Sequence, residues 1–352
     1  MTLQTAYIRS RAFFKGNGVR GGVRDKQGQR GMVVAVIMVM FANVVFSQDI
    51  HFSQTDYILV LTDPGYSGFF DGKGRFGLIY RNQWASVHDP FQTIAATIEV
   101  PVHQNKYHRS GFSLGGYLYA DKAGTLSYGT LSADLIVSYY KAFNTYNDNL
   151  ISIALMGGFN RVGFDPTDAI MEDMSEQFDR EKVNYPTIGA GVAYYSQLSQ
   201  EFVLKVGVSA YNLNRPKLSY FSESKTRLEP RFNAYVRGDW RFVQQWSFMP
   251  VAAVQFQYNN MEILAGTDFK YIVDESSRRL LSFQFGAAYR WADAVIFDIG
   301  VEYNQYLFFF LYDANLSKLT PASNSIGAFE VGIVYRLNRG RQKYQALPCP
   351  II

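Results

Sequence analysis

The sequence predicts an all-β fold, a transmembrane outer-membrane β-barrel of about 14 antiparallel strands with short periplasmic turns and longer extracellular loops. Three observations indicate it. Apolar and polar residues alternate along many segments, and aromatic residues make up 16% of a chain whose mean hydropathy is only −0.10. Beyond residue 46, no run approaches the roughly 18 apolar residues of a spanning helix. A sheet with one apolar face, one wet face and aromatic girdles between them has these properties.

The alternation assigns side chains to the two faces of the predicted sheet. In the segment 281–291, Phe283 shares a face with other apolar residues, and Gln284 lies on the opposite face. Val206 and Lys205 stand in the same relation further upstream. Because successive side chains of a strand point to opposite faces, we expect Phe283 and Val206 to face lipid and their two polar neighbours to face the lumen.

Segments with this pattern are mostly close to the 9 to 11 residues that a tilted strand needs to cross a bilayer. Their number is even, as in bacterial single-chain barrels whose two ends both face the periplasm. The predicted strands are 75–84, 91–101, 111–120, 127–140, 149–160, 187–196, 201–213, 231–240, 246–256, 261–270, 281–290, 294–302, 305–314 and 325–336.

A soluble β-sandwich also alternates, so further features are needed to decide between the two folds. The strands are long, no break divides them into sandwich-sized groups, and the N-terminal region predicts export, as argued below. A closed barrel also leaves no unpaired strand edge in lipid. The polar face carries glycines and charges that suit a wet lumen, and we expect these charges to face it: Glu99, Asp134, Lys205, Arg237, Asp298 and Glu330.

The connections between strands assign the two ends of the barrel. The longest, 161–186 and 214–230, fall on the same side and are expected to be extracellular. The short ones, such as 197–200 and 241–245, alternate with them and are expected to be periplasmic turns. Residues 165–180 begin with an Asp-Pro pair that suits a helix N-terminus, which predicts a short acidic helix in the first long loop.

The N-terminal region predicts a signal peptide. An apolar run at 32–46 is shorter than a spanning helix and follows seven basic residues and one acidic residue. Small residues at −3 and −1 predict cleavage between Ser47 and Gln48. The alternatives are an uncleaved membrane anchor and a start codon within residues 1–31. No cysteine follows the apolar run, which argues against a lipid anchor.

Removing the leader leaves 27 basic and 29 acidic residues, so the sequence pI of 8.9 gives no reason to expect a nucleic-acid partner. The single cysteine, Cys349, excludes an intramolecular disulfide. The predicted organisation is a signal peptide, an N-terminal periplasmic or plug segment, the barrel and a C-terminal tail, at 1–47, 48–74, 75–337 and 338–352.

The segment 48–74 mixes five aromatic residues with the turn formers Asp63, Pro64 and Gly65, unlike a solvated tail. It is long enough to fold back into the barrel mouth. We expect it to occlude or cap the periplasmic side and to offer a docking surface to periplasmic partners. Charges of both signs on the lumen face suit the pairing across such a plug, whereas a selective channel favours a ring of one sign.

Candidate chemistry is sparse. Ser86, His88 and Asp89 lie close together, but neighbours on a strand point in different directions and no nucleophile elbow is present, so a barrel lipid hydrolase is an unfavoured alternative. His103 and His108 lack the other ligands of a metal site. The sequence therefore predicts no catalytic residue, no metal and no cofactor.

Several short motifs follow one another in the order of a known family. They are QDIHFSQ at 48–54, YRNQW at 80–84 (including Arg81, Asn82, Gln83 and Trp84), a Gly/Asp/Gly hairpin in 113–140, an Asn-x-x-basic-Pro turn in 206–220 and a terminal hairpin at 308–337. Together they resemble the PorP/SprF family of Bacteroidetes outer-membrane proteins over essentially the whole mature chain. The chain departs from the family pattern at 55–68, where relatives usually carry an Asn-Pro-Ala/Gly-like segment, and its leader is extended.

This resemblance implies a non-enzymatic outer-membrane component of the type IX secretion system, the system that also serves gliding motility. It implies a setting in outer-membrane lipid and partners such as PorK/PorN-like periplasmic ring proteins and a peptidoglycan-binding lipoprotein. One branch of the family instead serves the C-terminal domains of secreted adhesins, and motifs this short do not separate the branches. A passive porin or nutrient channel is the alternative from another functional class.

Overall fold

The computed structural model describes residues 52–53, 57–70, 72–84, 90–105, 110–123, 128–143, 149–164, 182–219, 226–276, 279–316 and 326–337. The expected signal peptide with its Ser47–Gln48 cleavage point, the acidic helix at 165–180 and the C-terminal tail lie outside these residues. Every expected strand lies largely within them.

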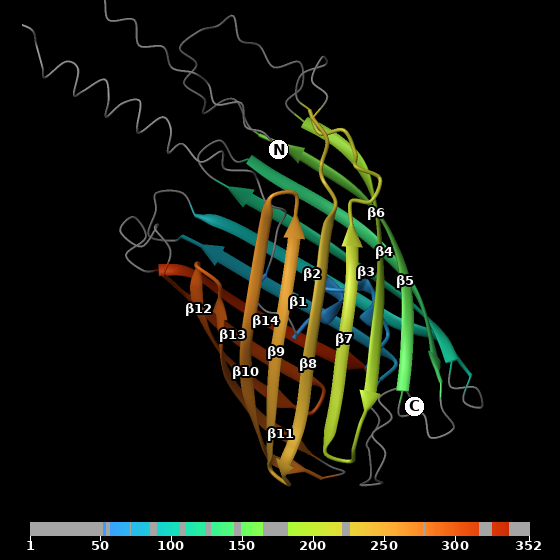
Figure 1. Ribbon diagram of the computed structural model, residues 1–352, viewed down its shortest axis with the longest axis vertical. Coiled ribbons are helices and arrows are strands. Elements are labelled where there is room, and N and C mark those ends of the chain that lie inside the picture. Colours follow the sequence, from blue (N-terminus) through green and yellow to red (C-terminus); the bar gives the residue numbers. More distant parts are fainter. Residues whose placement is uncertain are drawn as a thin grey trace, which may run out of the picture. The chain divides into compact units, whose positions relative to one another are not determined.

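The described strands close into a barrel in which each strand pairs antiparallel with its neighbours along the chain, and β1 pairs with β14 (Figure 1). This confirms the sequence-predicted barrel of 14 strands. The strands are β1 Gly74–Gln83, β2 Phe91–Asn105, β3 Ser110–Ala123, β4 Tyr128–Ala142, β5 Asn149–Gly163, β6 Lys182–Gln197, β7 Phe202–Tyr211, β8 Arg231–Val243, β9 Trp246–Gln257, β10 Asn260–Glu275, β11 Leu280–Arg290, β12 Ala294–Tyr303, β13 Tyr306–Asn315 and β14 Ile326–Leu337.

Two strands extend past prolines that the sequence suggests as boundaries. β6 begins at Lys182, and Pro186 pairs with Phe159 of β5. The pairing of β6 with β7 begins only at Ala190, so Pro186 lies on an edge where its missing N–H removes no ladder hydrogen bond. β2 similarly continues past Pro101 through an irregularity in its register with β3.

The barrel wall has an apolar outer face and a largely polar inner face. On β4, Leu135 is 75% exposed on the outside, whereas its neighbours Asp134 and Ile136 are buried inside. Phe283 is exposed on the outer face, and Gln284 points inward, where its side chain donates to Asp268 at 3.0 Å. The alternation therefore marks the faces in the way expected for a barrel.

The four tryptophans lie at the two ends of the wall. Trp84 and Trp291 directly follow β1 and β11, at the end where the long β5–β6 and β7–β8 connections lie, here called the long-loop end. Trp240 and Trp246 lie near the β8–β9 turn at the opposite end, here called the short-turn end. Such belts are typical of the two interfaces of an outer-membrane barrel.

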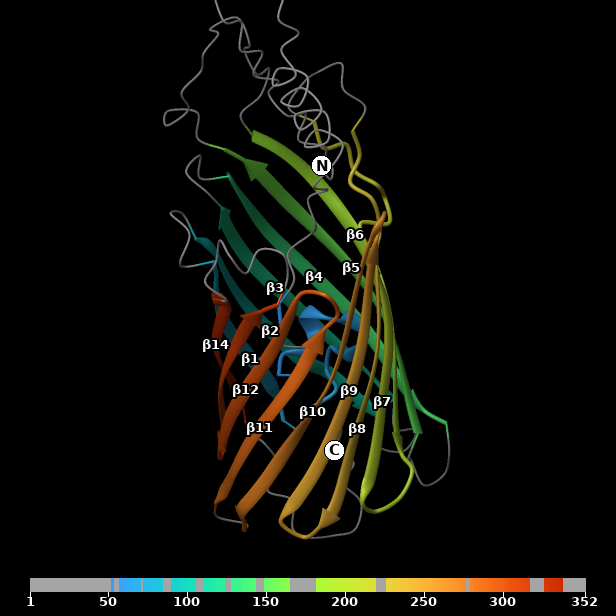
Figure 2. The same cartoon turned by 60° about the vertical axis from the view of Figure 1, so that its left-hand side comes forward.

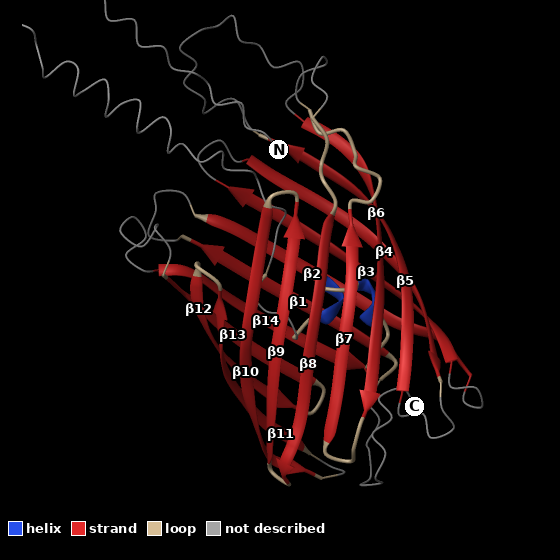
Figure 3. Cartoon of the chain, viewed as in Figure 1, coloured by secondary structure: helices blue, strands red, loops and turns tan. Residues whose placement is uncertain are grey.

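Residues 57–70 form the plug, which carries two 3₁₀ helices, η1 Leu59–Leu61 and η2 Pro64–Tyr66. The strands surround these helices, as Figures 2 and 3 show, with the helices coloured blue in both. Among the residues that the structure describes, no helix is long and apolar enough to span a membrane.

Candidate functional site: the plugged lumen

The plug is a buried part of the barrel interior. Twelve of its 14 residues are buried, and the remaining two, Leu61 and Thr62, are half-buried. Its apolar side chains pack against wall residues in two clusters, one that includes Val60 and one that includes Tyr66. A segment with this much buried apolar surface is held by the hydrophobic effect as a structural element.

The local sequence of the plug explains its turns. Asp63 precedes η2, and its Oδ1 accepts a hydrogen bond of 2.7 Å from the backbone N–H of Gly65, as an N-cap does. Pro64 occupies the first helical position, where a missing N–H costs nothing. Gly68 then adopts a φ of +85°, which favours glycine, and its N–H donates to Glu99.

The wall is shaped to receive the plug. A Cβ added to Gly191 of β6 would lie 2.1 Å from Asp63 Oδ1, and one added to Gly207 of β7 would lie 2.3 Å from Asp63 Oδ2. A Cβ added to Gly115 of β3 would lie 2.4 Å from Ser67 Oγ. These three inward-facing glycines therefore leave the room that the plug fills.

Hydrogen bonds join the plug to strands around the barrel. Tyr57 donates through its hydroxyl to Asp298 on β12 at 2.6 Å, and its ring stacks on Phe309 of β13 at 4.5 Å. The Tyr66 hydroxyl lies 3.2 Å from two backbone carbonyl oxygens, those of Tyr194 and Val206. The wall donates in return, since Ser209 Oγ and Asn233 Nδ2 both reach the carbonyl oxygen of Thr62, at 2.9 and 3.0 Å.

A buried ionic cluster holds the chain just before the plug. Ser53 donates from its backbone N–H to Glu330 and from its hydroxyl to Asp313, each at 2.6 Å. Arg81 pairs with Glu330, and Arg290 pairs with Asp313 at 3.0 Å. We call these residues the Ser53 cluster. Its four charged members come from β1, β11, β13 and β14, so the cluster crosses the β1–β14 seam with two charges of each sign.

The sequence-expected charges occupy different places on the inner face. Glu99 is fully buried and pairs with Arg75 of β1 through two contacts of 2.7 and 2.8 Å. Asp298 and Glu330 contact the N-terminal segment as described above. Arg237 pairs with Asp268 at 3.0 Å. Lys205 lies opposite Arg237 in the β7–β8 register. Asp134 accepts from Ser132 and Thr187.

The YRNQW motif places one side chain in the Ser53 cluster and the others near the end of β1. Arg81 is 2% exposed and belongs to the cluster. Gln83 accepts from Arg81 at 3.4 Å, and Asn82 donates to the Tyr80 hydroxyl at 3.2 Å. Trp84 has a φ of +58° and meets Phe91 edge-on at 5.0 Å. The motif thus links the lumen charges to the aromatic belt.

Sequence reasoning overlooked several members of this site. The sequence patterns do not indicate roles for Ser53, Arg75, Asp268 and Asp313, although each is buried in the folded barrel. Arg290 stands on the polar face of the 281–291 alternation, and this was a usable signal. Nothing in the sequence near Ser53 indicates that a serine closes an ionic cluster with residues more than two hundred positions away.

The structure also corrects the expected position of the N-terminal segment. It does more than cap the periplasmic mouth, because Ser53 contacts residues near the long-loop ends of β11 and β13, whereas Gly68 contacts Glu99, which pairs with Arg75 at the short-turn end of β1. The segment therefore runs along the lumen. Its plug residues are buried, so they do not form the docking surface that was expected of them.

Burial has a strong effect on Asp63. Desolvation raises the pKa of its carboxyl to about 8, although the Gly65 N–H acts in the opposite direction. Oδ2 has no hydrogen-bond partner among the described residues. The pKa of the adjacent Tyr66 is also raised, first by burial and then by Asp63. A neutral, protonated Asp63 therefore suits this site at neutral pH.

The candidate hydrolase and metal-binding groups are not gathered in the described part of the chain. No cluster of three or more histidine, cysteine or acidic residues suited to a metal ion occurs among the described residues. His103 lies on β2, whereas Ser86, His88, Asp89 and His108 lie outside the described residues.

The closed wall, the aromatic belts and the filled lumen define an outer-membrane β-barrel with an internal plug. The family model described as Type IX secretion system membrane protein PorP/SprF matches residues 44–335, so the chain belongs to the PorP/SprF family. No curated protein matches the chain.

Three solved structures are similar to this chain. The TodX monoaromatic hydrocarbon channel deltaS2 mutant is 7% identical, with a TM-score of 0.50 over 78% of this chain and 93% of that chain. The Ralstonia pickettii toluene transporter TbuX is 10% identical, with a TM-score of 0.48 over 78% and 92%. A Pseudomonas aeruginosa FadL homologue is 10% identical, with a TM-score of 0.47 over 78% and 92%. At these identities the likeness concerns the fold alone.

Proposed function

We infer that this protein is a non-enzymatic assembly component of the type IX secretion system in the outer membrane. In this role it docks to periplasmic ring proteins and a peptidoglycan-binding lipoprotein, and it supports surface delivery of cargo that carries a C-terminal signal domain. Membership of the PorP/SprF family supports the assignment to the type IX secretion system. The observation that carries the non-channel role is the chain's own N-terminal segment, which lies buried across the lumen and packs against the wall.

The charges of the lumen support this role over that of a passive porin. They pair wall to wall, as Arg75 does with Glu99, Arg81 with Glu330, and Arg237 with Asp268. Charge-selective pores instead present a ring of one sign to the permeating ion. Glu99 also accepts from Gly68 of the plug and Glu330 from Ser53 just before it, and these contacts stabilise a closed barrel.

Because the plug is buried, we assign docking to the short-turn end. The exposed charges there include the Arg241–Glu275 pair, with 2.8 Å between the nitrogen and the carboxylate oxygen. A comparable exposed pair, Arg215–Glu229, lies at the long-loop end with a separation of 2.5 Å. Exposed pairs add little stability, so reversing one charge changes the surface at a small cost to the fold, although Arg241→Glu also removes the hydrogen bonds that Arg241 donates to the Gln244 carbonyl in the β8–β9 turn.

These two pairs give a matched test in the native organism. Tagged Arg241→Glu protein is expected to insert normally, to lose co-purification of the periplasmic partners and to reduce secretion of type IX cargo. Arg215→Glu protein is expected to retain both. Full partner recovery and secretion with Arg241→Glu, or equal losses with the two variants, would count against docking at the short-turn end.

A further inference from the structure

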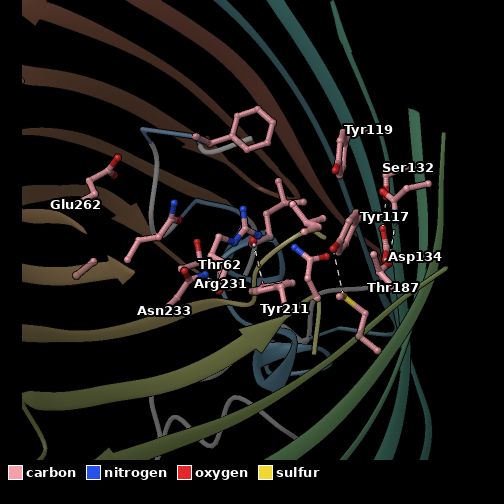
Figure 4. A pocket seen from close by; sticks show the side chains of 18 of the residues that line it. Thr62, Tyr117, Tyr119, Ser132, Asp134, Thr187, Tyr211, Arg231, Asn233 and Glu262 are labelled. Atoms are coloured by element: carbon pink, nitrogen blue, oxygen red, sulfur yellow. Dashed lines mark hydrogen bonds between the residues drawn. The ribbon is translucent and has the colours of Figure 1, made fainter. Parts of the chain in front are cut away.

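A cavity of about 90 Å³ lies on the long-loop side of the plug. Strands on both sides of the barrel line it, from β3 to β10, and the plug contributes Leu61 and Thr62 (Figure 4). At roughly 10–15 Å³ per water position, it holds about six to nine water molecules. That volume matches a single sugar ring with its hydroxyl groups.

The lining combines aromatic rings with planar polar groups. Tyr117 and Tyr119 on β3 stand together with their rings 6.2 Å apart, and Tyr211 on β7 lies under the guanidinium of Arg231 at 4.4 Å. In Figure 4, Tyr117, Tyr119 and Asp134 lie on one side of the cavity, and Glu262 lies on the opposite side. Aromatic rings can pack against the apolar face of a sugar, and amides and carboxylates can bind its hydroxyl groups. This combination in the lining therefore suits a carbohydrate.

Asn233 supplies the most specific signal. It is 8% exposed, and its Nδ2 donates to the carbonyl oxygen of Thr62 at 3.0 Å. Its Oδ1 has no hydrogen-bond partner among the described residues. A buried acceptor of this kind favours a ligand that brings a donor. Tyr117 is also poorly matched, since its hydroxyl donates to the thioether of Met156 at 3.2 Å, and a thioether is a weak acceptor.

Charge narrows the class of ligand further. The cavity presents Asp134 and Glu262 together with Arg231, and Arg290 already pairs with Glu262 at 3.7 Å. An anionic ligand would be repelled by the two carboxylates, and a cationic ligand would be repelled by the guanidinium of Arg231. A neutral ligand avoids both conflicts, and hydroxyl groups serve as donors and acceptors at once.

We propose that this cavity binds one ring of a neutral saccharide, with Asn233 Oδ1 accepting from a ring hydroxyl and the tyrosines contacting an apolar face. The same Asn233 side chain holds the plug, so an occupied cavity also fixes the amide in the orientation that bonds Thr62. Binding therefore stabilises the seat of the plug.

The test uses the full-length protein in detergent and saturation-transfer NMR with glucose, galactose and N-acetylglucosamine. At least one sugar is expected to give ring-proton signals and to raise the temperature at which the folded barrel is lost. Tyr119→Leu and Asn233→Ala are expected to weaken the signal at least tenfold. Tyr139→Leu on the outer face of β4 is the matched control and is expected to keep it.

Signals from the single sugars point to a free sugar as the ligand, whereas signals only from a linear oligosaccharide point to one ring of a longer glycan. Absence of signal from both, or full signal in Tyr119→Leu and Asn233→Ala, overturns the proposal. If Asn233→Ala loses its folded barrel, Tyr119→Leu, whose ring lies beside Tyr117 on the wall strand β3, decides the question.

Discussion

At the residue scale, Asp63 shows how one side chain connects sequence, fold and lumen. One oxygen caps η2, and both oxygens lie against wall positions where any residue with a Cβ would collide. The Asp-Pro-Gly sequence was sufficient to predict a turn. It did not predict burial, because the residues that cover Asp63 come from β6 and β7, about 130 to 145 positions later.

The raised pKa of Asp63 predicts that the barrel loses stability as pH rises. Between its ordinary pKa of 3.8 and its folded-state pKa of about 8, only the folded protein keeps the proton, so stability is greatest at the acidic end and falls until about pH 8. Tyr66 faces the carboxyl and has a raised pKa, so it stays neutral. Thermal unfolding from pH 5 to 9 should show this slope in the wild type and a flatter profile in Asp63→Asn. Identical slopes in the two proteins would refute the assignment.

A second residue-scale prediction concerns the Ser53 cluster. Glu330→Gln leaves the buried charge of Arg81 with a weaker partner, and removal of one member of a buried pair costs about 3–5 kcal/mol. Glu275→Gln breaks the exposed pair with Arg241 and should cost less than about 1 kcal/mol. Urea-unfolding midpoints in lipid vesicles measure both, and equal costs would show that the cluster contributes no more than a surface pair.

At the element scale, the alternation was enough to predict each of the 14 strands, because one face of every strand packs inward and the other points out. It failed at the start of β6, where the proline argument overlooked a free edge. The loop after β7 completes that edge, since the Asn214 side chain donates to the Pro186 carbonyl at 2.8 Å and accepts from the Ile188 N–H at 3.2 Å. Here a single side chain supplies the hydrogen bonds that a neighbouring strand would make, and such a side chain produces no alternating pattern in the sequence.

Strand β11 gives the test of the faces. Arginine at an outward mid-membrane position should cost about 2–4 kcal/mol, so Phe283→Arg should lower the yield of folded, heat-modifiable barrel. Gln284→Arg points inward toward Asp268 and should cost little. Comparable losses in both variants would mean that the faces have been exchanged.

At the scale of the whole molecule, the aromatic content of residues 48–74 indicated a packed segment, but not its course. The contacts that fix the course join residues that lie far apart in the chain, such as Ser53 and Glu330 or Tyr57 and Asp298. The inward-facing glycines of β3, β6 and β7 were visible in the sequence, yet only the folded plug shows what they accommodate. The alternation of apolar and polar residues predicts strands, whereas closure of the lumen depends on how well the shapes of the plug and the wall match.

The central claim, a barrel closed by its own N-terminal segment, is tested most directly by single-channel conductance in planar bilayers. The wild type is expected to show no steady open channel, whereas Gly207→Leu, which fills the space of Asp63 Oδ2, should open a conducting lumen. Gly157→Leu, on the outer face of β5 where an added Cβ meets nothing within 4 Å, should behave as the wild type. A steady open channel in the wild type, unchanged in Gly207→Leu, would contradict the account.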